Sequence, residues 1–190
     1  MTKMEQINDQ VIDSLKEVLF TERQIQEKVQ ELGKQISIDY QGKNPLFVGI
    51  LKGVFFFMAD LMRTVTINCE VDFMAISNYN HQIRAQGVVR IVKDLDLSIH
   101  GRHVIFVEDV IDTGLTLNYL LKNLRERNPA SLEVCTIFNK PAHRLIEIPI
   151  KYKGFDLPDR FVVGYGLDHS EKYRNMPFLG LLESKKIHSP

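Results

Sequence analysis

The sequence predicts an α/β fold in which a central, mostly parallel sheet is flanked by helices. Stretches with strand character alternate with amphipathic helical stretches, an order typical of βαβ units. Residues 104–107 are apolar at every position, as expected for a strand that is covered on both faces. With 190 residues, 44% hydrophobic and 25% charged, the chain is expected to form one domain.

The N-terminal part predicts an extension followed by a helix. Residues 1–17 are polar with scattered apolar positions, so we expect an extension before the domain. Thr21 and Gln24 have the spacing of a capping box, and apolar residues then recur at helical spacing. This helix is expected to end near residues 40–42, where a glycine stands.

A strand–helix unit and then a strand–strand unit come next. Residues 45–51 predict the first central strand, and residues 54–64 predict a largely buried helix. Residues 69–77 and 87–93 predict two strands that pair as a hairpin, with a long polar loop at 78–86 between them.

The second half continues the alternation. Residues 102–107 predict a strand, residues 115–127 a helix with leucines on its core face, and residues 131–138 another strand. Residues 149–158 contain two prolines and a glycine and are expected to be irregular. A short late strand is expected at residues 161–164.

Composition excludes several classes of function. Lys+Arg and Asp+Glu both number 24, so the net charge is zero and a nucleic-acid partner is not expected. No apolar run approaches the ~20 residues that span a bilayer, and no signal peptide is recognisable, so we expect a cytoplasmic protein without membrane contact. Cys69 and Cys135 lie in apolar surroundings and are expected to be reduced, buried thiols and not zinc ligands.

One segment carries most of the chemistry. Glu108 and Asp109 directly follow the apolar run, at the carboxyl end of a strand, where open α/β sheets bind ligands. Asp112 and residues 113–116, Thr-Gly-Leu-Thr, then supply hydroxyls and free N–H groups at a helix start, which suit a phosphate. Carboxylates beside a phosphate require a cation or ligand hydroxyls, so the segment predicts a sugar phosphate bound with Mg²⁺.

This segment resembles the 5-phosphoribosyl-1-pyrophosphate (PRPP) binding motif of type I phosphoribosyltransferases. Further similar blocks lie at residues 49–53, 87–95 and 161–174, in the same order, and the likeness runs from about 18 to 182. Within the family the resemblance is to the hypoxanthine-guanine group. It implies the type I fold, with residues 18–190 as a single domain and a small hood lobe from N- and C-terminal segments.

The resemblance implies a purine salvage enzyme. Such an enzyme joins PRPP to hypoxanthine or guanine with Mg²⁺, giving IMP or GMP and pyrophosphate, and is expected to be a homodimer or homotetramer. Two alternatives stay open: a regulator that keeps the PRPP-binding fold but binds RNA or DNA, and a transferase that uses xanthine or uracil.

The resemblance also assigns roles around the motif strand. Glu108 and Asp109 are expected to hold the ribose hydroxyls, directly or through Mg²⁺. Asp112 is expected to accept the proton from purine N7, although an aspartate there could instead cap the following helix. The 5-phosphate is assigned to Asp112, Thr113, Gly114, Leu115 and Thr116.

Three residues are assigned to pyrophosphate: Lys52, Gly53 and Arg174. In the family the peptide between the residues equivalent to Leu51 and Lys52 can be cis. Asp168 is expected to bind a second Mg²⁺ that is shared with pyrophosphate.

The purine is assigned to Lys140, Phe161, Val162 and Asp168. Lys140 would donate to the oxygen at purine C6, and Phe161 would stack on the base, although a core position is the alternative for Phe161. Asn78 and Tyr79 are expected to belong to a mobile lid, in which relatives usually carry Ser-Tyr.

Overall fold

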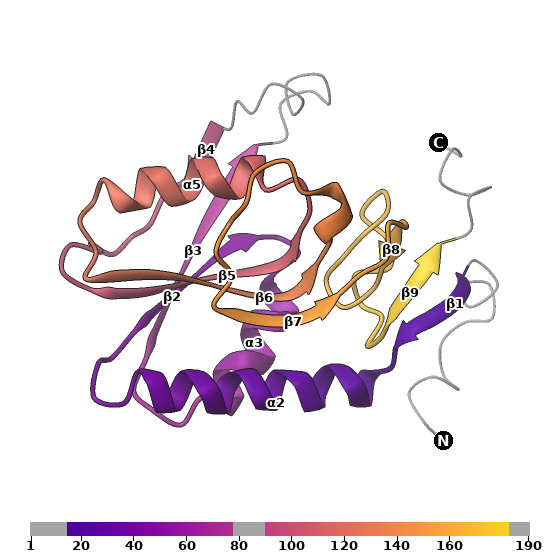
Figure 1. The fold of residues 1–190 in the computed structure, drawn as a ribbon, viewed down its shortest axis with the longest axis horizontal. Coiled ribbons are helices and arrows are strands. Elements are labelled where there is room, and N and C mark those ends of the chain that lie inside the picture. The colour runs from indigo at the N-terminus through magenta and orange to yellow at the C-terminus, as the bar shows by residue number, and fades with distance from the viewer. Residues whose placement is uncertain (1–14, 78–89, 183–190) are drawn as a thin grey trace.

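The computed structural model describes residues 15–77 and 90–182. These residues form three layers, with a six-stranded sheet between α5 (Leu115–Arg125) on one face and α2 (Glu22–Asp39) and α3 (Phe55–Thr64) on the other (Figure 1). A separate three-stranded sheet lies at one end of the large sheet. None of the helices in the described residues is long and apolar enough to cross a membrane.

The large sheet is parallel except at one edge. Its strands, in spatial order, are β4 (Arg90–Lys93), β3 (Glu70–Ser77), β2 (Leu46–Leu51), β5 (His103–Ile111), β6 (Ser131–Asn139) and β7 (Tyr152–Asp156). Only the β3–β4 pair is antiparallel. The predicted mostly parallel sheet and the predicted hairpin are confirmed.

The sheet is covered on both faces because its central strands are apolar at consecutive positions. Val104 and Phe106 of β5 belong to the core under α5, whereas Ile105 and Val107 belong to the core under α2 and α3. All four are fully buried. Burial of every residue of a run, and not of alternate residues, is what a strand between two helical layers requires.

The capping box at the start of α2 is present. The Thr21 hydroxyl accepts from the Gln24 N–H, and the Gln24 side chain accepts from the Thr21 N–H at 2.9 Å. These two bonds satisfy donors that a helix start otherwise leaves unpaired. The helix ends at Asp39, with Tyr40 as its C-cap, as the sequence predicted.

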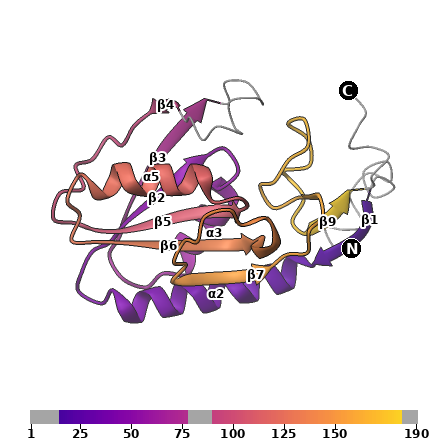
Figure 2. The same cartoon turned by 45° about the horizontal axis from the view of Figure 1, so that its top comes forward.

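The hood combines the two ends of the described chain. Strands β1 (Leu15–Phe20), β9 (Leu179–Leu182) and β8 (Val162–Val163) form an antiparallel sheet in that order. Figure 2 shows β1 beside β9. The predicted hood lobe from N- and C-terminal segments is therefore present. Strand β1 begins inside the stretch 1–17 that we expected to be an extension.

Two sequence-based expectations about strands were wrong. Residues 149–158 are not irregular throughout, because Tyr152–Asp156 forms the edge strand β7. Glu108 and Asp109 do not follow the motif strand but lie within β5, which runs on to Ile111. The strand is longer because β6 continues beside it, with Ile111 paired to Asn139.

Candidate active site

A hollow of about 650 Å³ lies where the carboxyl ends of the parallel strands face the hood. The predicted site residues that line it are Lys52, Gly53, Asp109, Asp112, Lys140, Phe161, Val162, Asp168 and Arg174. They come from segments far apart in the sequence. The fold brings them together because parallel strands end at the same edge of the sheet.

Glu108 and Asp109 lie in the part of β5 that no longer pairs with β2. Strand β2 pairs with β5 only as far as Val107, while β6 pairs with β5 to its end. Burial raises the pKa of Glu108 well above its ordinary value, and the adjacent Asp109 adds to the shift. Burial likewise raises the pKa of Asp109 to about 6, partly offset by the nearby Arg174. A cation or ligand hydroxyls would compensate for this buried negative charge.

Gly53 packs directly on Asp109. A Cβ added at Gly53 would lie 1.8 Å from Oδ2 of Asp109, so any larger residue would displace either this loop or the Asp109 carboxylate. The preceding peptide, Leu51–Lys52, is cis, as the resemblance implied. The loop thus presents its backbone close to the buried carboxylates.

Residues 113–116 lead into α5, and the Leu115 N–H among them makes a long, 3.4 Å hydrogen bond to the Thr113 hydroxyl. The N-cap is Gly114, in the left-handed conformation at φ 81°, and no side chain caps the helix. A Cβ at Gly114 would also lie 2.8 Å from the Ile146 carbonyl oxygen. The Thr113 carbonyl accepts from the Leu145 N–H at 2.9 Å, which anchors the loop. This geometry leaves the helix start available to an anion.

Asp112 does not cap the helix. Its side chain is half exposed and one oxygen, Oδ1, lies 2.9 Å from Nδ1 of His143. The N-cap is Gly114, so Asp112 does not have the capping role that was its alternative. The carboxylate instead borders the hollow, where it can meet a ligand.

The other wall of the hollow suits a flat, partly polar ring. Phe161 is 38% exposed, so it is not the core residue that was its alternative. The neighbouring Val162 is buried in β8 and also lines the hollow. Beside them, the Lys140 ammonium donates to the carbonyl of Arg160, the residue before Phe161, at 3.0 Å. An aromatic face beside a fixed cationic donor fits a base that carries an oxygen.

Charged side chains form a continuous chain at the hood side. Arg174 contacts Asp168 at 2.8 Å and Glu171 at 3.4 Å, and Glu171 contacts Lys52 at 3.2 Å. The ionised Lys52 and Arg174 lower the pKa of Glu171. Nε of Arg174 is buried without a hydrogen-bond partner among the described residues. Two cations gathered around a carboxylate suit a larger anion such as pyrophosphate.

Comparison with known proteins decides the family. A family model described as the phosphoribosyl transferase domain matches residues 17–170. The chain belongs to the phosphoribosyltransferase family. A hypoxanthine-guanine phosphoribosyltransferase of Streptococcus agalactiae is 46% identical over 173 residues, which are 91% of this chain and 96% of that protein. The corresponding Bacillus subtilis protein is 45% identical over 169 residues, with shares of 89% and 94%.

Other relatives show the same domain in a different setting. The bifunctional protein TilS/HprT of Listeria monocytogenes is 44% identical over 176 residues, and this chain spans 27% of its length. A solved hypoxanthine phosphoribosyltransferase structure from Staphylococcus aureus matches with a TM-score of 0.91 and 43% identity, covering 97% of this chain and 100% of that one. The resemblance and the type I phosphoribosyltransferase fold are confirmed.

Some predicted residues of this phosphoribosyltransferase lie apart from the hollow or outside the description. Glu108, Thr113, Gly114, Leu115 and Thr116 do not line it, although they flank residues that do. The lid residues Asn78 and Tyr79 lie outside the described residues.

Three residues near the site were not singled out from the sequence. Glu171 stands between Asp168 and Arg174 at three-residue spacing, and this regular charge pattern could have indicated it. His143 contacts Asp112, and Arg144 donates to the Asp112 carbonyl at 3.0 Å. No sequence pattern marks these last two residues, because their contacts join separate segments.

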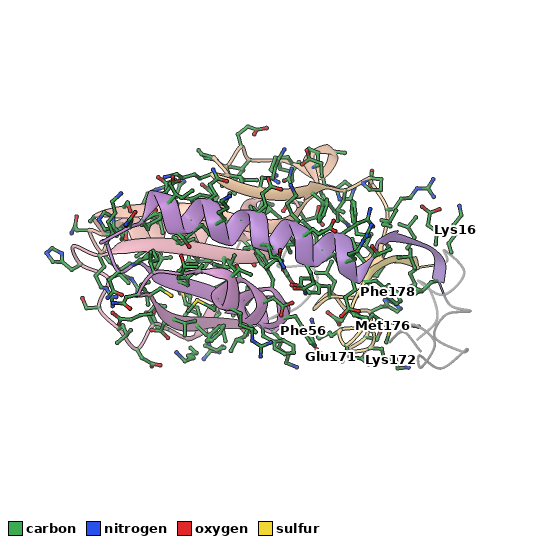
Figure 3. All side chains as sticks on the ribbon, turned by 90° about the horizontal axis from the view of Figure 1, so that it is seen from below. Lys16, Phe56, Glu171, Lys172, Met176 and Phe178 are labelled. Atoms are coloured by element: carbon green, nitrogen blue, oxygen red, sulfur yellow. The ribbon has the colours of Figure 1, made fainter. Side chains whose placement is uncertain are left out.

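A second hollow, of about 570 Å³, adjoins the first. It lies between the start of α3 and residues 171–176, where Figure 3 labels Phe56, Glu171, Lys172 and Met176. Glu171 and Arg174 border both hollows. The charged chain therefore borders both the first hollow and this second, more apolar one.

Proposed function

We propose that this protein transfers the phosphoribosyl group of PRPP to hypoxanthine or guanine. The products are IMP or GMP and pyrophosphate. The observation that carries the proposal is the hollow itself, in which one wall holds Phe161 and Lys140 and the other holds Asp109 and Asp112. The proposal is also supported by the names of the relatives that match most of this chain.

The base would bind between the hood and the sheet. Phe161 stacks on the purine, and the Lys140 ammonium donates to the oxygen at C6. Lys has donors and no acceptor, so it matches a carbonyl and not the amino group of adenine. Asp112 takes the proton from N7 as the new bond to ribose forms, which raises the electron density on the attacking ring nitrogen.

The phosphates would be divided between two positive regions. The uncapped start of α5 and the Thr113 and Thr116 hydroxyls hold the 5-phosphate. Lys52, Arg174 and the backbone at Gly53 hold the pyrophosphate as it leaves. These contacts neutralise charge on the departing group, and that charge is greater in the transition state than in bound PRPP.

The residues present suit Mg²⁺. Glu108, Asp109 and Asp168 supply hard oxygen ligands, and a bound cation would counter the burial that raises the pKa values of the first two. Among the described residues, no group of three or more His, Cys, Asp or Glu side chains could hold a metal ion by itself. Mg²⁺ commonly binds one or two carboxylates together with substrate phosphates, and when bound it would neutralise pyrophosphate.

The experiment is a product assay with purified protein. PRPP and Mg²⁺ are incubated separately with hypoxanthine, guanine, xanthine, adenine and uracil, and nucleotides are separated by chromatography. We expect IMP and GMP with equimolar pyrophosphate. Absence of both nucleotides, or UMP as the main product, would refute the proposal.

The regulator alternative is tested separately by nucleic-acid binding at several salt concentrations. Binding through phosphates weakens steeply as salt rises, so a real nucleic-acid site would show that dependence. The zero net charge of the chain favours the enzyme.

A further inference from the structure

His143 bridges two carboxylates at the edge of the hollow. Its Nδ1 lies 2.9 Å from Oδ1 of Asp112, and its Nε2 contacts Oδ1 of Asp159. Asp159 lies in the segment between β7 and β8, so the ring joins the phosphate loop to the hood side of the chain. A carboxylate oxygen is a hydrogen-bond acceptor, so the tautomer that carries its proton on Nδ1 donates to Asp112.

The backbone around His143 is held in place. His143 ends a short 3₁₀ helix, Pro141–His143, whose N-cap is Lys140. The next residue, Arg144, donates to the backbone carbonyls of Asp112 and Ile111 at 3.0 and 3.3 Å. His143 and Arg144 thus hold the side chain and the backbone of Asp112, close to Lys140, which is expected to donate to the purine oxygen.

We propose that His143 is a positioning residue for proton transfer, acting through Asp112 and itself oriented by Asp159. The inference rests on the proposed function, in which Asp112 accepts the N7 proton. The ring holds Oδ1, which points the other oxygen, Oδ2, toward the purine. A carboxylate that is free to rotate would present that oxygen only part of the time, so catalysis would slow without loss of substrate binding.

Two conservative variants separate this role from a structural one. In His143→Asn the amide nitrogen takes roughly the place of Nδ1 and keeps a donor for Asp112. In His143→Gln it takes roughly the place of Nε2 and keeps a donor for Asp159. His143→Gln should lower kcat on the order of tenfold, the scale of one hydrogen bond to a charged group, with KM for PRPP unchanged.

His143→Asn should keep at least about half of the native kcat. If His143 only fastens its own loop to Asp159, the ranking of the two variants by kcat reverses. His143→Gln is then the more active and the more heat-stable variant. That order, or an equal loss in both variants, would overturn the proposal. His100→Gln is the matched control, because His100 is exposed in the turn before β5, away from the hollow.

A double-mutant cycle separates this inference from the proposed function. If His143 acts through Asp112, then Asp112→Asn with His143→Gln is no slower than Asp112→Asn alone. Multiplicative losses would overturn the inference and leave the role of Asp112 intact. Native turnover in Asp112→Asn would instead remove Asp112 as proton acceptor, and the inference would fall with it.

Discussion

Asp112 shows how a single residue acquires its role from its surroundings. Its carboxylate is held on one oxygen by His143, and its carbonyl is held by Arg144. Gly114 occupies the N-cap position of α5, so Asp112 does not cap this helix. The side chain therefore remains available to a ligand in the hollow, next to the loop expected to bind the phosphate.

Asp112→Asn should bind PRPP normally but turn over slowly. The amide keeps the size of the carboxylate and loses its ability to accept a proton, a loss that commonly costs about 10²–10⁴-fold in rate. The measurement is kcat together with the dissociation constant for PRPP. Turnover within about threefold of the native value would exclude the general-base role.

Lys140→Gln should reduce the preference for hypoxanthine over adenine. An amide can donate to the C6 oxygen or accept from an amino group, whereas the ammonium can only donate. The measurement is kcat/KM for both bases in the native and variant proteins. If the ratio of the two kcat/KM values is unchanged, Lys140 does not select the base, and the backbone at Val162 is the remaining candidate.

Asp168→Asn should raise the Mg²⁺ concentration needed for half-maximal activity. Asp168 contacts Arg174 at 2.8 Å, and an asparagine would leave a weaker oxygen ligand there. A Mg²⁺ titration of the initial rate measures this, with excess chelator as the control. Full activity of the native protein in chelator would contradict the metal assignment.

At the scale of elements, Asp72 joins three parts of the sheet edge. Its carboxylate accepts from the backbone N–H groups of Asp96 and Leu97 and contacts the Lys93 ammonium. Burial alone would raise the pKa of Asp72, but these hydrogen bonds outweigh burial and hold the pKa below its ordinary value. The charged form is therefore favoured more in the folded state than in the unfolded one.

Asp72→Asn should lower the free energy of unfolding by about 2 kcal/mol at pH 7, the scale of hydrogen bonds to a charged group. Because the folded-state pKa is depressed, this contribution is present above about pH 4 and is lost as pH falls through the folded pKa. Urea denaturation at pH 7 and pH 3 measures it. A difference that stays the same at both pH values would contradict the assignment.

The elements that the sequence predicted are those with local patterns. Helix α2 has its capping box, and β5 has its uninterrupted apolar run. Strand β7 was missed because Gly154 was taken as a break, yet a Cβ there would lie 2.3 Å from the Ile137 carbonyl oxygen. The glycine allows close approach of two strands, a reason that only the tertiary structure reveals. Strands β1 and β9 pair across most of the chain, which no local pattern shows.

The site residues also divide into those that a local sequence pattern predicts and those that only the tertiary structure brings together. Residues 108–116 could be placed together from their motif, because the end of a parallel strand and the start of the next helix are adjacent in sequence and in space. The contacts of His143 with Asp112 and of Glu171 with Lys52 join segments that are 31 and 119 residues apart. Such contacts depend on how the sheet and the hood meet, so the sequence alone does not predict them.

At the scale of the whole molecule, neither lobe is sufficient for the proposed reaction. The sheet side supplies Asp112, the phosphate loop and Lys140, whereas the hood side supplies Val162 from β8 and Phe161 immediately before it. The hollow is lined by residues from both lobes. Base choice therefore reports on the assembled site more directly than any single substitution does.

The most direct measurement is a competition assay in which equal concentrations of hypoxanthine and adenine share one solution with PRPP and Mg²⁺. The ratio of IMP to AMP formed equals the ratio of the two kcat/KM values. A site built to hydrogen-bond a C6 oxygen should favour IMP on the order of 10⁴-fold, because adenine would leave the Lys140 donor unpaired. Comparable amounts of AMP and IMP would contradict the proposed base pocket and, with it, the function.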